Sequence, residues 1–169
     1  PYQRRGLEIL PENIPLDIKY EDDDLMVINK PAGMVVHPGH GHYNGTLVNA
    51  LAYHLGLRQE ADEGDERMGM LVHRIDKDTS GLLVVAKTPR AKTALGAQFF
   101  NKTTKRQYIA VVWGEMKQED GTVTGNIGRS LRDRLQMCVF PDGDMGKHAV
   151  THYHTLENLA HVAVVRCQL

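Results

Sequence analysis

The chain has 169 residues, 41% of them hydrophobic and 24% charged, and its formal net charge is −1 at pH 7. This length allows one domain with a hydrophobic core, and the composition excludes disordered and fibrous proteins. No apolar run approaches the ~20 residues of a membrane span, the first residues lack the pattern of a secretory signal, and the two cysteines form no CxxC pair. We therefore expect a cytoplasmic protein without a disulfide framework.

The near-zero net charge hides a separation of charge along the chain. Residues 60–66 (EADEGDE) and 21–24 (EDDD) contain acids and no base. Residues 87–108 contain no acid, and their cations are Lys87, Arg90, Lys92, Lys102, Lys105 and Arg106. A basic segment beside acidic ones is typical of a protein that binds a phosphate-rich partner, and a solvated helix with a charged surface is the alternative.

The first half of the chain alternates strand and helix signals. Residues 1–15 are expected to form an arm or linker, and residues 16–169 a single domain. The apolar run 24–30 predicts a buried strand, and the Pro-Ala-Gly that follows it predicts a turn. Residues 37–42 (HPGHGH) are then a loop. A helix is expected from Thr46 to Gly56, with leucines at i, i+4 and i+8, and residues 58–69 are expected to be a solvated loop.

The second half is richer in strand signals. Residues 82–86 (LLVVA) predict a central strand, and residues 89–100 a helix. The inner side of that helix is expected to carry Ala91, Ala94, Leu95 and Phe99. Residues 106–115 predict a strand, and 149–156 with 161–169 the arms of an antiparallel hairpin. The order predicts an α+β fold, with a mixed or mostly antiparallel β-sheet flanked by helices and loops. Neither GxGxxG nor GxxxxGK[ST] occurs, so no nucleotide cradle is evident.

The stretch 71–81 (LVHRIDKDTSG) places two carboxylates between two cations, just before an apolar run. If it is extended, Arg74 and Asp76 share one face, and the guanidinium would keep the Asp76 carboxylate ionised. A carboxylate on such a rigid edge can attack or stabilise an electron-poor sugar carbon, as glycosidic-bond chemistry requires. The alternative is an ordinary ion pair at the end of a surface strand.

Four motifs in the same order resemble the RluA-type pseudouridine synthases. Residues 73–87 (HRIDKDTSGLLVVAK) resemble the family signature HRLDxxTSG, with Ile75 in place of the usual Leu. The other three stretches are 18–39, 105–114 (KRQYIAVVWG) and 146–157 (GKHAVTHYHTLE). VVHPG followed by NGTLVNAL is most similar to the RluD branch, which modifies large-subunit ribosomal RNA. The resemblance covers residues 14–169.

The resemblance implies the pseudouridine synthase fold and the isomerisation of uridine to pseudouridine in RNA, without a cofactor or a metal. We also expect a monomer. It makes Asp76, and not Asp78, the catalytic carboxylate that acts on the ribose as nucleophile or base. It gives Arg74 the task of displacing the target base from its stack, and Tyr108 that of packing on the flipped uracil. The residues expected to contact RNA phosphates are Lys87, Arg90, Lys102, Lys105 and Arg106.

Two features of the family are missing from this sequence. The family's Thr-Gly-Arg…His-Gln-Ile-Arg motif, which follows a strand such as VVRCQL (164–169), does not occur, and neither does the S4 RNA-binding domain. We expect the chain to be an incomplete catalytic domain that lacks its C-terminal motif and is inactive by itself.

Three other hypotheses remain open. His37, His40 and His42 could bind zinc from one loop, although the glycine-rich spacing gives no rigid geometry. A non-catalytic RNA-binding module could keep the same fold. A pseudouridine synthase could also act on transfer RNA instead of ribosomal RNA.

Overall fold

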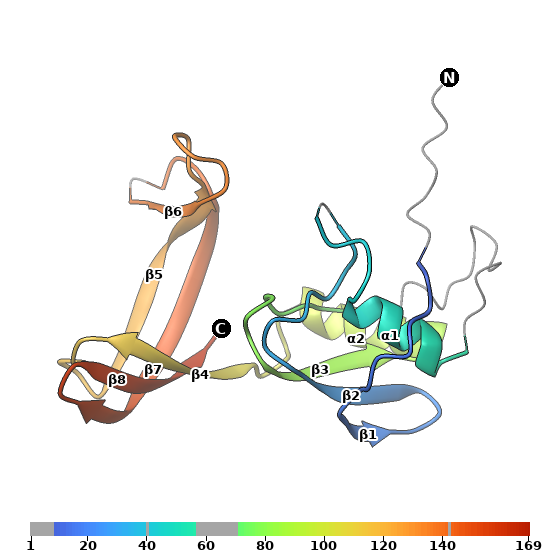
Figure 1. Ribbon diagram of the computed structural model, residues 1–169. Helices are drawn as coiled ribbons and strands as arrows, with labels where there is room; N and C mark the ends of the chain where they lie inside the picture. The colour runs from blue at the N-terminus through green and yellow to red at the C-terminus, as the bar shows by residue number, and fades with distance from the viewer. Residues whose placement is uncertain (1–8, 40, 57–70, 142) are drawn as a thin grey trace. The chain divides into compact units, whose positions relative to one another are not determined.

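The computed structural model describes residues 9–39, 41–56, 71–141 and 143–169 (Figure 1). The expected acidic loop at 58–69 lies outside these ranges. The chain forms two compact units, Pro1–Thr103 and Thr104–Leu169. Both expected secondary-structure types are present, and every strand pair in the described ranges is antiparallel rather than mixed. The expected α+β class is therefore confirmed.

The first unit is built on a three-stranded sheet in the order β1-β2-β3. Its strands are β1 (Ile18–Glu21), β2 (Leu25–Lys30) and β3 (Gly81–Ala86). The expected strand at 82–86 is present, but its predicted central position is wrong, since β2 lies between the other two. The outer edge of β3 meets Leu71 in an isolated bridge to Val85, and α2 contacts β3, which explains its apolar sequence.

Alternation along β2 builds the core of this unit. Met26, Ile28 and Lys30 are fully buried, whereas the residues between them are half-buried. Leu83 and Val85 of β3 are also fully buried. A strand that points every second side chain into the core normally places apolar residues there, so Lys30 takes a position that the pattern assigns to a hydrophobic residue.

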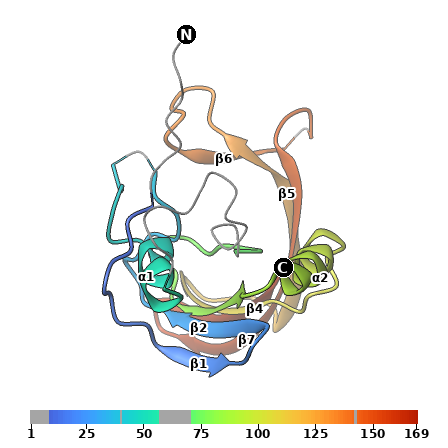
Figure 2. The same ribbon diagram turned by 90° about the vertical axis from the view of Figure 1, so that its right-hand side faces the viewer.

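Two helices complete the first unit and lie on one side of its sheet (Figure 2). They are α1 (Leu47–His54) and α2 (Pro89–Phe100), close to their expected ranges. Thr46 caps α1 in a capping box with Asn49, and Thr88 caps α2 by accepting from the amide of Ala91. The left-handed backbone of Gly56 (φ 64°) follows the end of α1, as expected.

Helix α2 buries a narrower stripe than the sequence predicts. Ala91 is buried, and Leu95 and Phe99 are half-buried, at i, i+4 and i+8. Ala94 was expected on the inner side and is exposed. The main packing partner of α2 among the strands is the edge strand β3, and Phe99 also stacks on His73, so one row of side chains is enough to cover these contacts.

Residues 9–15 of the expected arm are hydrogen-bonded to the start of α1. The side-chain amide of Asn49 donates to the carbonyl of Leu10 at 2.8 Å, and the amide of Glu12 donates to the carbonyl of Asn49 at 3.0 Å. The Glu12 carboxylate accepts from the amide of Gly45 at 2.9 Å. This part of the arm is therefore attached to the first unit.

The second unit is a five-stranded antiparallel sheet in the order β4-β8-β7-β5-β6. Its strands are β4 (Gln107–Trp113), β5 (Asp120–Arg129), β6 (Met137–Phe140), β7 (Lys147–Leu159) and β8 (Val162–Gln168). The predicted strand at 106–115 and the predicted hairpin correspond to β4 and to β7 with β8. A Cβ on Gly121 would overlap the ring of Tyr153, so this cross-strand position requires glycine.

Candidate active site

Asp76 lies on a loop that leads into β3, and its neighbours alternate as a short extended segment. Arg74 and Asp76 are exposed, and Ile75 between them is buried with 7% of its surface accessible. The alternation ends at Lys77, which is exposed in a turn. The buried Ile75 anchors this loop to the core, so the Asp76 carboxylate is presented to solvent from a fixed backbone.

The loop is held again directly after Asp76. The carbonyl of Lys77 accepts two hydrogen bonds, from the amide of Gly33 at 2.8 Å and from the ammonium of Lys30 at 2.9 Å. The carbonyl of Asp76 accepts from the amide of Thr79 at 3.2 Å. The Pro-Ala-Gly turn after β2 is therefore joined to the turn that follows the candidate carboxylate.

Lys30 is the buried cation of this site. Its ammonium donates to the carbonyls of Pro31, Met34 and Lys77 at 2.8 to 2.9 Å, which uses all three of its protons. Burial lowers the pKa of Lys30, and the negative charges of Asp78 and Asp76 oppose this effect. In the sequence, Lys30 stands at the end of a predicted strand, where a lysine is usually exposed. The sequence does carry one signal of its burial: Lys30 alternates in step with Met26 and Ile28, whose side chains point into the core.

His73 fixes the start of the same loop. Its ring stacks on Phe99 of α2, with centroids 4.3 Å apart and planes inclined by 15°. Its Nε2 accepts a hydrogen bond of 3.0 Å from the amide of Val84. A ring nitrogen that accepts must be unprotonated, so this contact favours the neutral imidazole. The His73 ring thereby satisfies a backbone amide of β3 that has no neighbouring strand in the described ranges to accept from it.

The expected ion pair between Arg74 and Asp76 is absent: no contact within 4.0 Å joins these two described side chains. Alternation places both side chains on one face, but it does not bring them into contact. Arg74 instead acts on His37, whose pKa is lowered, first by burial and then by the positive charge of Arg74. The Asp76 carboxylate is therefore left without a salt bridge.

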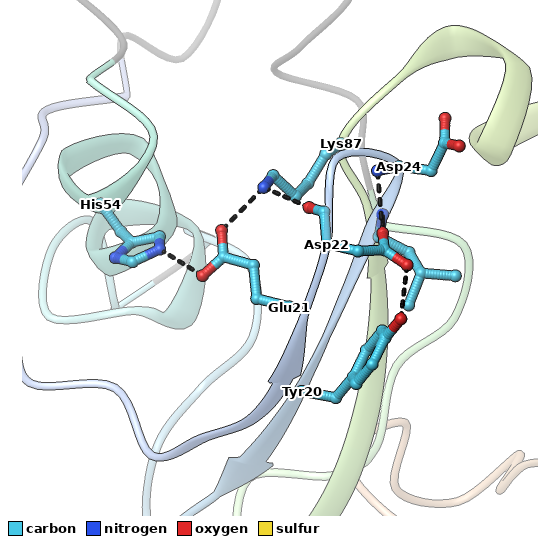
Figure 3. A network of polar contacts seen from close by, with 7 residues as sticks. Tyr20, Glu21, Asp22, Asp24, His54 and Lys87 are labelled. Carbon is cyan, nitrogen blue, oxygen red and sulfur yellow. Dashed lines mark hydrogen bonds and ion pairs between the residues drawn. The ribbon is translucent and has the colours of Figure 1, made fainter.

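Two of the expected RNA-binding cations already have acidic partners, and Figure 3 shows the first of them, Lys87. Lys87 pairs with Glu21 at 2.8 Å and also donates to the backbone carbonyl of Asp22. Arg90 pairs with Asp24 at 2.8 Å, although its side chain is 83% exposed. Two acids of the run at 21–24 thus neutralise Lys87 and Arg90 of the basic segment.

The same network shapes the turn between β1 and β2 (Figure 3). The Asp22 carboxylate accepts from the hydroxyl of Tyr20 and from the amides of Asp24 and Leu25, and these three contacts lower its pKa. Glu21 contacts His54 at 3.0 Å, and its hydrogen bond to Lys87 is the main cause of its lowered pKa. These acids therefore stabilise the β1–β2 hairpin as well as pairing with cations.

The remaining cations have different environments. Lys102 and Lys105 are exposed, and within the described ranges neither forms an ion pair. Arg106 is half-buried. Lys102 follows the C-terminal end of α2 with a left-handed backbone (φ 55°), which directs the chain out of the helix. Lys102 and Lys105 are thus the cations of this set that are available to an external anion.

Tyr108 lies in the second unit, on β4, whereas Arg74 and Asp76 belong to the first. Its side chain is half-buried, and its register partner on β8 is Cys167. Cys167 in turn pairs with Tyr153 of β7, so the three side chains share one face of the sheet. The backbone that carries the Tyr108 ring is therefore fixed by the regular antiparallel pairing of β4 with β8.

The histidine loop is described only in part. His40 lies outside the described residues. Gly39 and His42 form a small antiparallel bridge, with backbone hydrogen bonds of 2.8 and 2.9 Å. The hypothesis of a zinc site formed by His37, His40 and His42 is therefore not tested as a set of three ligands.

Comparisons with known proteins identify the class to which this fold and this loop belong. The family model for RNA pseudouridylate synthase matches residues 24–169, so the chain belongs to that family. The expected resemblance is confirmed, including its RluD branch. A protein of Zymomonas mobilis called ribosomal large subunit pseudouridine synthase D is 48% identical over 94% of this chain. An uncharacterized RNA pseudouridine synthase of Bacillus subtilis is 51% identical over 97% of it.

A solved structure supports the fold independently of close sequence similarity. Human RNA pseudouridylate synthase domain containing 1 superposes with a TM-score of 0.71 at 22% identity, over 99% of this chain and 62% of that one. The chain spans about half the length of the curated relatives it matches, 49% for the Zymomonas protein and 52% for the Bacillus protein. No helix in the described part of the chain is long and apolar enough to cross a membrane.

Proposed function

We propose that this chain belongs to an enzyme that isomerises uridine to pseudouridine in RNA, with Asp76 as the catalytic carboxylate. The observation that carries the proposal is the placement of Asp76. Its carboxylate is exposed and free of a salt bridge, while Ile75 on one side is buried and Lys77 on the other accepts two hydrogen bonds. A reactive group needs both access and a fixed backbone, and Asp76 has both.

The chemistry requires one carboxylate rather than two. The bond between ribose C1′ and uracil N1 breaks, the base turns, and a bond between C1′ and C5 forms. The proton on C5 is then lost and N1 gains one, so atoms and electrons balance without water or a redox partner. A hydrolase needs a second carboxylate to activate water, whereas here Asp76 acts on the ribose as nucleophile or base. Asp78 has no role in this scheme.

Arg74 and Tyr108 complete the proposed machinery. A base stacked in RNA must be extruded before its ribose can be attacked, and an exposed guanidinium can occupy the space that it leaves. Arg74 is exposed, two residues from Asp76. Tyr108 is proposed to stack on the extruded uracil, because every base offers a π-face to an aromatic ring.

The exposed cations are proposed to contact the RNA backbone. Lys102 and Lys105 are available to phosphates, with Arg106 beside them. Lys87 and Arg90 must exchange Glu21 and Asp24 for phosphates, so their contribution is smaller. Such contacts give affinity without reading sequence.

The proposed substrate is large-subunit ribosomal RNA. The support is the name that relatives from Zymomonas mobilis, Xylella fastidiosa and Haemophilus influenzae share, ribosomal large subunit pseudouridine synthase D. We propose that the enzyme works in the cytoplasm as a monomer. Transfer RNA is the alternative substrate, and RNA binding without turnover is the alternative function.

A product analysis tests this proposal. The full-length protein that contains this chain is incubated with unmodified large-subunit ribosomal RNA or with unmodified transfer RNA. Each RNA is digested to nucleosides, which are separated by chromatography, because uridine and pseudouridine have the same mass. Pseudouridine in the ribosomal RNA alone is the expected result. Pseudouridine in transfer RNA alone would show that transfer RNA, and not ribosomal RNA, is the substrate. Tight binding of RNA without pseudouridine in either RNA would favour the alternative function, RNA binding without turnover.

A further inference from the structure

Three potential metal ligands meet where β5 begins. Figure 1 shows β5 beside β7, the strand with which it pairs. Asp120 is the first residue of β5 and is the register partner of His154 in β7, and Glu119 directly precedes it. One ligand atom from each of the three lies within 4.8 Å of the other two. The shortest contact joins His154 Nδ1 and Asp120 Oδ1 at 2.8 Å. In the described ranges this is the one such group.

The backbone on both strands fixes these three residues. The amide of Thr155, next to His154, donates to the carbonyl of Glu119 at 2.6 Å. The hydroxyl of Thr155 donates to the carbonyl of Gln118 at 2.9 Å. These two contacts join the backbone before Asp120 to the histidine strand, and the pairing of β5 with β7 joins the backbone after it, so the carboxylates do not start from a free loop.

The charge at this position is not balanced. Within the described part of the chain, neither Glu119 nor Asp120 forms an ion pair with a lysine or arginine. Even a protonated His154 carries one positive charge against two negative ones. Arg166 is the register partner of His154 on β8, but no ion pair joins it to either carboxylate. By contrast, Asp17, Glu21 and Asp24 each pair with a lysine or arginine.

We propose that Glu119, Asp120 and His154 bind one divalent transition-metal ion, through two carboxylate oxygens and the imidazole Nδ1. Ligands around such an ion lie at about 2.0–2.2 Å from it, so a set of atoms that already lie within 4.8 Å needs only small side-chain rotations. Two oxygens and one imidazole suit zinc and its first-row neighbours better than calcium or magnesium, which prefer oxygen ligands alone. The other coordination positions remain open to water.

The site is separate from the proposed chemistry at Asp76, which needs no metal. Metal binding would instead stabilise the sheet, because one ion held by residues of β5 and β7 cross-links the two strands. Binding to the folded state alone stabilises that state by mass action. The inference therefore holds whether or not the chain belongs to an active isomerase.

Zinc titration of the 169-residue chain tests the proposal, with a chromophoric indicator as competitor. His152→Ala is the matched control, because His152 is exposed on the same strand and face, two residues from His154, and contacts Thr122 instead. We expect one zinc ion per chain, with affinity reduced about tenfold or more in His154→Ala and Asp120→Asn and unchanged in His152→Ala. Zinc should also raise the melting temperature of the wild type and not that of Asp120→Asn.

Two outcomes would overturn the proposal. One is zinc uptake that is undiminished in both His154→Ala and Asp120→Asn. A double substitution of His37 and His42 would then identify the histidine loop as the source. The other is absence of uptake at about 1 mM zinc, which corresponds to a negligible affinity. If His154→Ala does not fold, Asp120→Asn decides, because the Asp120 side chain is 72% exposed.

Discussion

The ammonium of Lys30 donates a hydrogen bond of 2.9 Å to the carbonyl of Lys77, the residue that directly follows Asp76. This contact crosses 47 positions of the sequence and joins the end of β2 to the candidate catalytic loop. It explains why a fully buried cation occupies a core position of the first unit. The loop is positioned by charge-assisted hydrogen bonds to its backbone, and its carboxylate side chain remains free to act.

Replacement of Lys30 by methionine should destabilise the first unit strongly. Methionine fills a similar volume but removes the ammonium from the carbonyls of Pro31, Met34 and Lys77, of which the last keeps the amide of Gly33 as a donor. We expect a loss of about 2–4 kcal/mol in the free energy of unfolding, measured by urea denaturation. Lys19→Met is the control, because its ion pair with Asp17 is exposed and its loss should change the free energy of unfolding little. Equal effects of the two substitutions would refute the positioning role of Lys30.

The β1–β2 hairpin should weaken in acid. Asp22 has an ordinary pKa of 3.8 that is lowered in the fold, first by its hydrogen bond from Tyr20. The unfolded chain therefore binds the proton more readily, so the stabilisation is complete above the ordinary pKa and is lost as the pH falls through the lowered one. Melting temperature measured from pH 6 to about pH 3 should fall less steeply in Asp22→Asn than in the wild type. The control is Asp23→Asn, at the exposed neighbour that forms no hydrogen bond or ion pair with a described residue, and its slope should match that of the wild type.

His73→Ala should loosen the start of the catalytic loop. It removes the acceptor for the Val84 amide and the stacking partner of Phe99. We expect a loss of about 1–3 kcal/mol in unfolding free energy. Faster hydrogen exchange at the Val84 amide should accompany it. His42→Ala serves as the control, because the described contacts of His42 are backbone hydrogen bonds with Gly39. An unchanged exchange rate at Val84 would show that the ring does not protect this amide.

The exposed cations should dominate RNA affinity. Replacing Lys102 and Lys105 together with glutamine should lower affinity for any RNA and reduce the slope of log affinity against log salt by roughly 0.7 per lost contact. Lys87→Gln should have a smaller effect, since Lys87 already pairs with Glu21. Filter binding over a range of salt concentrations measures both quantities. A larger effect of Lys87→Gln would mean that phosphates displace Glu21 on binding.

Apolar runs and caps made much of the fold predictable. The strand at 24–30 and the helix after Thr46 stand out because their hydrophobic periodicity and end signals agree. By contrast, β1 and β5 have polar sequences (IKYE and DGTVTGNIGR), and they are strands because their neighbours supply hydrogen bonds. Tertiary context overrides local preference in such strands.

The sequence proposes residues for the candidate site, but it does not show what holds them in place. A periodicity of two places Arg74 and Asp76 on one face, but it gives no distance, and the expected ion pair is absent. The burial of Lys30 runs against the strong tendency of lysine to be exposed. The pair of Lys87 with Glu21 joins residues far apart in the chain, which no local pattern encodes.

The central claim is that Asp76, and not its neighbour Asp78, carries the isomerisation. The most direct measurement uses the full-length protein and ribosomal RNA labelled with tritium at uracil C5, since formation of the new C1′–C5 bond expels that tritium into water. Wild type and Asp78→Asn should release it at similar rates, whereas Asp76→Asn should release none while still binding RNA. Release from Asp76→Asn at the wild-type rate would contradict the account.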